Sequence, residues 1–399
     1  MSYLNIIRKH PNFLSYGMLH YFFSSIGQTF LISVSVPFML TDLDISSGNF
    51  SNAYAVATLS SAFLLPLAGK WVDRLSLRLL SLLGGLGLVL ASIVMFQVDN
   101  LVLLIFGLFL LRFFGQGSMI LIGSTAIARF FSSNRGKALS VSSLGLAFAE
   151  TLTPLLFVWL IAQYGWQTSW LFPIGAVLLV FIPVTQFLIL RARKEPDSAN
   201  EDFTNNDNDF TVKQMFRDPR FYMILPAFAF LPFFITGIFI HQNMLASAKG
   251  WTMEWMAACF IGFGIAKVLT SFMGGWLVDK FSAKSVFSFY LIPMALGLLL
   301  LLFLDHRLVG VFYMILIGIT ASLGSLTGVA IWAELYGVKN LGAIKSMVTM
   351  MMVVATAIGP IVIGWGFEQS LNYTLMFSIG FILVTSLVGR LGLSQNSFM

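Results

Sequence analysis

Long apolar stretches follow one another along almost the whole chain and constrain its fold more than any other feature. A helix that crosses a lipid bilayer needs about 20 predominantly apolar residues. Inside a bilayer, the backbone polar groups must bond to one another, which only helices and closed barrels achieve. The sequence therefore predicts an all-α membrane protein with twelve transmembrane helices, at 13–41, 49–72, 77–97, 101–130, 135–163, 168–190, 220–247, 254–278, 284–304, 307–334, 340–366 and 370–394.

The amino-acid composition supports a membrane protein. Hydrophobic residues make up 58% of the 399 residues and charged residues only 10%, whereas a soluble domain has about 25% charged residues. The net charge is +6. In a membrane protein, basic residues gather on the cytoplasmic side, so we expect the lipid bilayer as a partner and no nucleic acid.

The residues that carry enzyme chemistry are sparse. Cys259 is the single cysteine, which excludes an intrachain disulfide and a multi-thiolate metal cluster. The four histidines are scattered, and the sequence contains no His-Glu-x-x-His motif and no phosphate loop. We therefore expect no enzyme, no catalytic residues, no cofactor and no metal.

One long polar segment, 191–219, interrupts the apolar pattern and is rich in Asn and Asp. Six predicted helices precede it and six follow it. The sequence therefore predicts an N-terminal six-helix bundle at 1–190, a cytoplasmic linker at 191–219 and a C-terminal six-helix bundle at 220–399.

The distribution of basic residues predicts the orientation in the membrane. Nineteen of the 23 Lys and Arg residues fall on loops of one side, whereas only Lys249 and Arg307 fall on the other. Arg112 and Lys267 lie inside predicted helices. Because cytoplasmic loops carry the excess of Lys and Arg, we expect both termini to face the cytoplasm.

The two halves of the sequence are related by an internal repeat. Six residues or conservative replacements recur 206 positions later, which indicates two parallel six-helix repeats. In transporters, such repeats place the binding site near the bilayer midplane, at the repeat interface. The recurring pairs are Gly69 and Gly275, Asp73 and Asp279, Arg74 and Lys280, Arg78 and Lys284, Gly136 and Gly342, and Pro154 and Pro360.

The loop between the second and third predicted helices carries the most specific motif. Residues 69–78 read GKWVDRLSLR, which resembles the signature loop of the major facilitator superfamily. A weaker copy, GWLVDKFSAK, occupies 275–284, and RFFGQG at 112–117 resembles the family's second motif. The resemblance covers the whole chain. It implies a bacterial-type secondary transporter of the inner membrane, in which two six-helix bundles work by alternating access.

A further stretch is similar to one branch of that family. Residues 129–140 read RFFSSNRGKALS, which resembles the monocarboxylate and oxalate–formate branch. That branch carries a basic residue on helix eight, four positions before the glycine that matches Gly275. This chain has Ser271 there and carries its basic residue, Lys267, one helical turn earlier.

The resemblance also implies gating roles for the charged residues of the two signature loops. These residues are Asp73, Arg74 and Arg78 in the first loop, and Asp279 and Lys280 in the second. In the family, such Asp residues hold the cytoplasmic side closed by charge pairing and by contact with a facing helix N-terminus. The alternative is a loop whose solvated charges only set the topology.

Three charged residues fall near the middle of predicted helices, where a charge is costly and marks function. We expect Arg112 and Lys267 to bind the solute, and Glu150 to carry the coupling proton. Gln28 and Gln116 are candidates to donate hydrogen bonds to the solute. Two alternatives stay open: a static pair between Arg112 and Glu150, and glutamines that serve as ordinary helix contacts.

These residues favour proton-coupled symport of a small organic anion by a monomer, with a carboxylate-type solute and the proton as partners. An exporter of amphipathic or drug-like compounds or siderophores is the main alternative, which the 15% aromatic content leaves open. A non-transporting membrane sensor built on the same fold is a third.

Overall fold

The computed structural model describes residues 3–131, 135–191, 210–337 and 340–394. Every regular element in these ranges is helical, which confirms the predicted fold class. The chain divides into two compact units, 1–201 and 202–399, which we call unit 1 and unit 2. Of the linker predicted at 191–219, residues 192–209 lie outside the described ranges.

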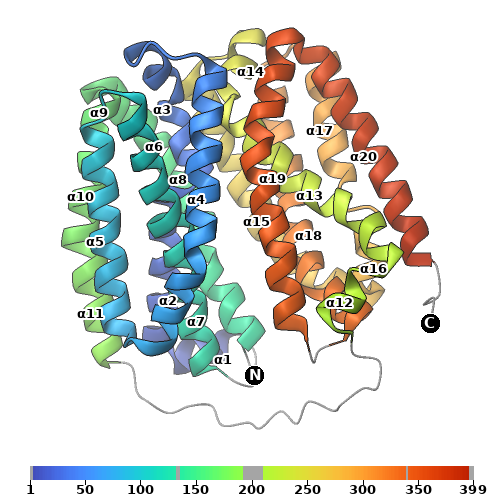
Figure 1. Cartoon of the computed structure of the whole chain (residues 1–399), viewed down its shortest axis with the longest axis horizontal. Coiled ribbons are helices and arrows are strands. Elements are labelled where there is room, and N and C mark those ends of the chain that lie inside the picture. Colours follow the sequence, from blue (N-terminus) through green and yellow to red (C-terminus); the bar gives the residue numbers. More distant parts are fainter. Residues whose placement is uncertain (1–2, 132–134, 192–209, 338–339, 395–399) are drawn as a thin grey trace. The chain divides into compact units, whose positions relative to one another are not determined.

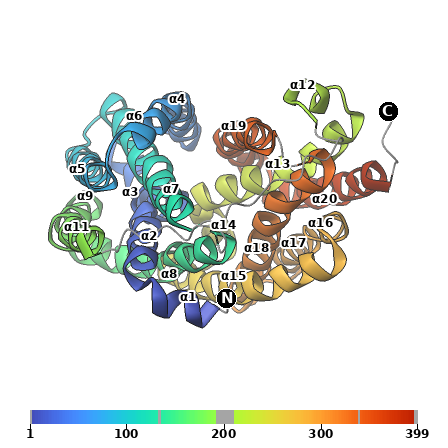
Figure 2. The same ribbon diagram turned by 90° about the horizontal axis from the view of Figure 1, so that it is seen from below.

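Unit 1 runs from blue to green in Figure 1. Its helix α2 packs against α7, α8 and α11, and α5 lies beside α6, α10 and α11 (Figures 1 and 2). The elements are α1 (Tyr3–Lys9), α2 (Pro11–Phe23), η1 (Ser24–Gly27), α3 (Thr29–Asp42), α4 (Ser47–Arg74), α5 (Leu77–Phe96), α6 (Leu101–Leu110), η2 (Leu111–Met119), α7 (Ile120–Phe130), α8 (Arg135–Tyr164), α9 (Trp166–Ser169), α10 (Leu171–Ala176), η3 (Val177–Phe181) and α11 (Ile182–Arg191).

Unit 2 runs from yellow-green to red in Figure 1. Its helix α13 packs against α19 and α20, and α18 packs against α15 and α17. The elements are α12 (Val212–Met215), α13 (Pro219–Ile240), α14 (Gln242–Ala248), α15 (Met253–Phe281), α16 (Ala283–Phe287), α17 (Ile292–Phe303), α18 (Val309–Tyr336), α19 (Leu341–Gln369) and α20 (Leu371–Ser394).

Eleven helical segments of the described residues are long and apolar enough to cross a membrane. They match eleven of the twelve predicted stretches. The twelfth stretch, 49–72, lies in α4, which has 28 residues and is therefore about 42 Å long at 1.5 Å per residue. The chain is thus a multi-pass membrane protein.

The first membrane segment contains an interruption that the apolar pattern did not predict. After α2, a 3₁₀ turn occupies Ser24–Gly27, and Gln28 then has extended backbone (φ −86°, ψ 150°) before α3 begins at Thr29. Serine and glycine are poorer helix formers than alanine or leucine, so the Ser-Ser-Ile-Gly sequence favours a break here. The segment therefore consists of two half-helices, α2 and α3.

The helix caps of the two units reproduce the internal repeat. Ser76 caps the N-terminus of α5 by accepting a hydrogen bond from the backbone N–H of Leu79 at 3.3 Å. Ser282, 206 positions later, caps α16 in the same way, with the N–H of Ser285 at 3.4 Å. The same serine cap thus lies within the signature loop of both units.

Candidate functional site

A π-helical segment in the fourth membrane segment carries two of the predicted site residues. The segment, η2, contains Arg112 and Gln116. Such π segments inside α-helices occur frequently at functional sites. Arg112 is only 2% exposed, although a charged side chain is expensive at this depth.

Arg112 is held by the interruption of the first segment. Its Nη1 donates hydrogen bonds to the carbonyl oxygen of Gly27 and to Oγ1 of Thr29, both at 3.4 Å. Its guanidinium carbon lies 5.2 Å from the ring centroid of Tyr54, whose hydroxyl is 2.7 Å from Oγ1 of Thr29. The Gly27 carbonyl ends the first half-helix, where the helix dipole favours a cation. Arg112 thus joins the fourth segment to the break in the first.

Two glycines allow these segments to approach closely. A Cβ atom on Gly27 would collide with the carbonyl oxygen of Leu111, and one on Gly115 would lie 2.6 Å from the backbone of Gly27. Gln28 and Gln116 each follow one of these glycines, and both are partly exposed. The glycine contact therefore brings Arg112, Gln28 and Gln116 to one level of unit 1.

Glu150 lies on α8, which packs against η1 and α3. Its side chain is 6% exposed. The described contacts of Arg112 are with Gly27, Thr29 and Tyr54, and Glu150 is not among them.

Lys267, the basic residue predicted in unit 2, lies half-buried on α15. Its Nζ is 5.6 Å from the ring centroid of Phe263, close enough for a cation–π attraction. Its carbonyl accepts a hydrogen bond from Oγ of Ser271 at 2.8 Å, and that hydroxyl is 2.9 Å from Oγ of Ser322 on α18. Small hydroxyl side chains thus join α15 to α18 one turn from Lys267.

The signature loop of unit 1 is fastened to α11. Nε of Arg78 donates to Oε1 of Gln186 at 2.9 Å, and Nε2 of Gln186 donates to the carbonyl of Arg78 at 3.0 Å. Arg74 is exposed at the end of α4. The side chain of Asp73 lies outside the part of the structure that is described.

The loop of unit 2 is fastened by Glu334 of α18. Its carboxylate accepts hydrogen bonds from the backbone N–H groups of Ala283 at 2.8 Å and Lys284 at 3.3 Å, at the start of α16. A carboxylate is favourable there because of the helix dipole. Lys280 is exposed, and the side chain of Asp279 is not described. Sequence reasoning missed Glu334, although it is the single acidic residue of the stretch 307–334.

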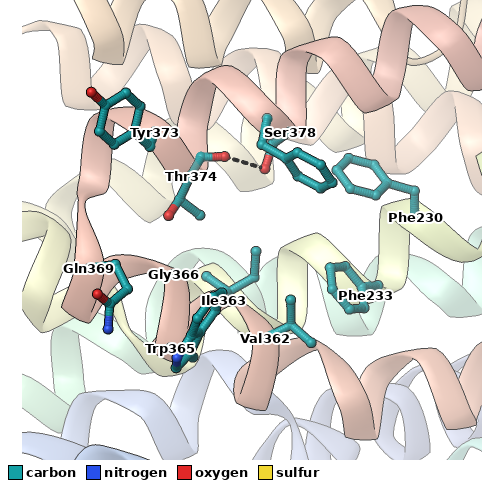
Figure 3. A pocket seen from close by; sticks show the side chains of 11 residues that line it. Phe230, Phe233, Val362, Ile363, Trp365, Gly366, Gln369, Tyr373, Thr374 and Ser378 are labelled. Atoms are coloured by element: carbon teal, nitrogen blue, oxygen red, sulfur yellow. Dashed lines mark hydrogen bonds between the residues drawn. The ribbon is translucent and has the colours of Figure 1, made fainter.

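An apolar cavity of about 400 Å³ opens on the surface of unit 2, between α13, α19 and α20 (Figure 3). Its aromatic side chains Trp365 and Phe377 are 66% and 72% exposed. The hydroxyl of Thr374 donates to the carbonyl oxygen of Ser370, and that of Ser378 donates to the carbonyl oxygen of Thr374. The lining residues are Phe230, Phe233, Val362, Ile363, Trp365, Gly366, Gln369, Tyr373, Thr374, Phe377 and Ser378.

Several bacterial transporters are similar to part of the chain. The uncharacterized MFS-type transporter YhcA of Bacillus subtilis is 24% identical over 196 residues, which are 49% of this chain and 36% of that protein. A putative proline/betaine transporter of Staphylococcus aureus is 27% identical over 159 residues, which are 38% of this chain and 34% of that protein. A multidrug resistance protein B homolog of Mycobacterium tuberculosis is 26% identical over 193 residues, which are 44% of this chain and 34% of that protein. The matched part thus spans about a third of the length of each of these relatives.

Solved structures share the fold over nearly the whole chain. The nucleoside transporter NupG has a TM-score of 0.68 at 13% identity, covering 96% of this chain and 99% of that chain. A bacterial homolog of the human lysosomal transporter Spinster, in an inward-facing and unoccupied conformation, has a TM-score of 0.67 at 14% identity, with 96% of both chains covered.

The sequence model of the Major Facilitator Superfamily matches residues 17–262 and 229–394. These ranges include both signature loops, the π segment with Arg112 and the α15 segment with Lys267. The relatives and the structural neighbours agree with this match. The chain belongs to the Major Facilitator Superfamily.

Proposed function

We propose that this protein is a secondary active transporter that couples the movement of a small organic anion to that of protons by alternating access. One observation carries the proposal: Arg112 is 2% exposed inside a membrane segment and contacts an interrupted helix. Ionisable residues at this depth mark substrate and ion pathways. Interrupted helices near the midplane build such sites in transporters.

A carboxylate-type solute fits these residues best. Arginine presents N–H donors in a planar fork that matches carboxylate geometry. Proline and betaine, which the name of the Staphylococcus aureus relative mentions, both carry a carboxylate. The proposed solute-binding residues are Arg112, Gln28 and Gln116 in unit 1 and Lys267 in unit 2.

Glu150 is the proposed proton carrier, because it is the one acidic residue near the middle of a membrane segment. A proton on Glu150 makes the interior of unit 1 more positive, which favours the binding of an anion. By linkage, a bound anion then favours the proton to the same extent. Cooperative binding of proton and anion is what symport requires.

The two signature loops are the proposed gating elements, through Asp73, Arg74 and Arg78 in unit 1 and Asp279 and Lys280 in unit 2. Support comes from the hydrogen bonds that Gln186 and Glu334 make with these loops. Because each loop is attached to another membrane helix, a movement of that helix displaces the loop.

The proposed location is a bacterial inner membrane with both termini in the cytoplasm, where the protein acts as a monomer. The distribution of basic residues supports this orientation: nineteen of 23 lie on one side.

Export of an amphipathic compound is the second candidate function. The observation that favours it is the apolar, partly aromatic cavity on the surface of unit 2 (Figure 3). The name of the Mycobacterium tuberculosis relative agrees with this candidate.

Ligand-dependent thermal unfolding of purified protein distinguishes the two functions, because a ligand that binds the native state stabilises it. The probes are oxalate, pyruvate, proline and the cationic dye ethidium. We expect a carboxylate to raise the unfolding temperature of the wild type and of Lys267→Arg, but not that of Lys267→Ala. The matched control is Lys213→Ala on α12, where the lysine is exposed. Stabilisation by ethidium and by no carboxylate would favour the exporter.

A further inference from the structure

The interruption of the first membrane segment creates a helix N-terminus within unit 1. Helix α3 has 14 residues and begins at Thr29. The N–H groups of Leu31 and Ile32 both donate to the carbonyl oxygen of Gln28 at 3.2 Å. Helix α3 itself offers no acceptor for the N–H of Thr29, its first residue, and Gln28, at the N-cap position, makes no side-chain capping hydrogen bond. This end of α3 therefore presents the N–H of Thr29 and a partial positive charge.

Arg112 adds a full positive charge at the same place. Its Nη1 is 3.4 Å from Oγ1 of Thr29, the first residue of α3. Its Nε–H is buried and has no hydrogen-bond partner among the described residues. A buried donor without an acceptor is unfavourable. A negatively charged acceptor beside the N-terminus of α3 would relieve that cost.

We infer that a carboxylate group of the solute binds at this point, where it accepts hydrogen bonds from the N–H of Thr29 and from Nε–H of Arg112. The inference rests on the proposed transport of an organic anion and assigns that anion a subsite within unit 1. Helix N-termini bind anions through these groups. Gln28 and Gln116 flank the subsite and are partly exposed, so their amides face a second polar group of the solute.

The internal repeat shows that the fold alone does not create this subsite. At the repeat offset, Gly318 occupies the position of Arg112, and Phe234 and Ile235 occupy those of Gln28 and Thr29. Helix α13 passes through the corresponding level without interruption, from Pro219 to Ile240. The equivalent positions of unit 2 thus provide neither a helix N-terminus nor a cation.

A pair of substitutions at Thr29 isolates the backbone donor. Thr29→Pro removes the N–H and the hydroxyl, whereas Thr29→Val removes only the hydroxyl. Proline is well tolerated as the first residue of a helix and requires an extended residue before it. Gln28 already has that conformation, with φ −86° and ψ 150°. A difference between the two variants therefore reports the N–H group.

The probe is formate, the smallest carboxylate, titrated at constant ionic strength against the purified full chain. Affinity is measured from the rise in unfolding temperature, with neutral formamide as the reference ligand. We expect formate to bind about tenfold more weakly to Thr29→Pro than to Thr29→Val, because a hydrogen bond to a charged group is lost. Arg112→Gln should lose the formate effect, and formamide should have none.

Three results would overturn the subsite: equal affinity of the two Thr29 variants, no stabilisation of the wild type by formate, or equal stabilisation by formamide. The transport proposal fails separately. If formate binds more weakly to Thr29→Pro than to Thr29→Val but a pH gradient drives no uptake, the subsite is supported and proton-coupled transport is wrong. If uptake is proton-driven but the two Thr29 variants bind formate equally, proton-coupled transport is supported and the proposed subsite is wrong.

Discussion

Nη1 of Arg112 lies 3.4 Å from the carbonyl oxygen of Gly27, a residue 85 positions away in the sequence. The contact joins a π-helical segment of one membrane helix to the break in another. A regular pair of helices would satisfy its own backbone groups and would offer no such carbonyl. The break, the π segment and the buried cation therefore form one structural arrangement.

Arg112→Gln should lower the thermal stability of the protein. The substitution removes the charged donor at the end of the first half-helix, and a hydrogen bond to a charged group contributes about 1.5–3 kcal/mol. The measurement is the unfolding temperature in detergent without ligand. The control is Arg191→Gln, which removes an exposed arginine at the end of α11 and should change stability by about 0.5 kcal/mol or less. Equal unfolding temperatures for the two variants would show that the Gly27 contact is unimportant for stability.

The fold could be predicted from the sequence because the bilayer leaves few alternatives. Apolar stretches of about 20 residues must be helices there. The 206-residue repeat predicted two related halves, and the serine caps at Ser76 and Ser282 occur at that offset. The break at Gly27 was missed because the pattern reports apolar length, and Ser24–Gly27 is compatible with an apolar run.

The candidate site was predictable only in part. A charge inside an apolar stretch is visible in the sequence, so Arg112, Glu150 and Lys267 stood out. The sequence did not predict their bonding partners. Arg112, for example, donates to the backbone carbonyl of Gly27, and a backbone carbonyl is present in every residue type. Gln186 and Glu334 were missed because their roles depend on which helix ends meet in space. The solute-binding, proton-coupling and gating roles remain predictions.

Glu334→Gln should loosen the signature loop of unit 2. A glutamine oxygen can accept one of the two backbone hydrogen bonds, but its amide nitrogen would then face the other N–H group. Amide hydrogen exchange at Ala283 and Lys284 should become faster, and transport should fall if the loop is a gate. Glu368→Gln, the same change at an exposed position, is the control. Unchanged exchange at both amides would contradict the capping role.

The orientation can be tested with one cysteine on each predicted side. Lys213→Cys lies on α12 and Asp99→Cys lies between α5 and α6, and both positions are exposed. The native Cys259 is buried, so the unsubstituted chain gives the background. If both termini are cytoplasmic, a membrane-impermeant thiol reagent should label Asp99→Cys in intact cells and Lys213→Cys only in inverted vesicles. The reverse pattern would overturn the proposed topology.

Proton-driven accumulation in proteoliposomes tests whether this protein couples an organic anion to protons. The purified protein is reconstituted, an inward proton gradient is imposed, and the uptake of a radiolabelled carboxylate that stabilises the protein is measured. Glu150→Gln is compared with Glu254→Gln, which changes an exposed glutamate at the start of α15. Solute exchange without a gradient is measured in the same vesicles.

We predict that the wild type and Glu254→Gln accumulate the carboxylate above its external concentration, and that dissipating the proton gradient abolishes the accumulation. Glu150→Gln should exchange solute at a comparable rate but should not accumulate it, because the glutamine cannot carry the coupling proton. Gradient-driven accumulation by Glu150→Gln equal to that of the wild type, or accumulation by the wild type without any proton gradient, would show that Glu150 does not couple transport to protons.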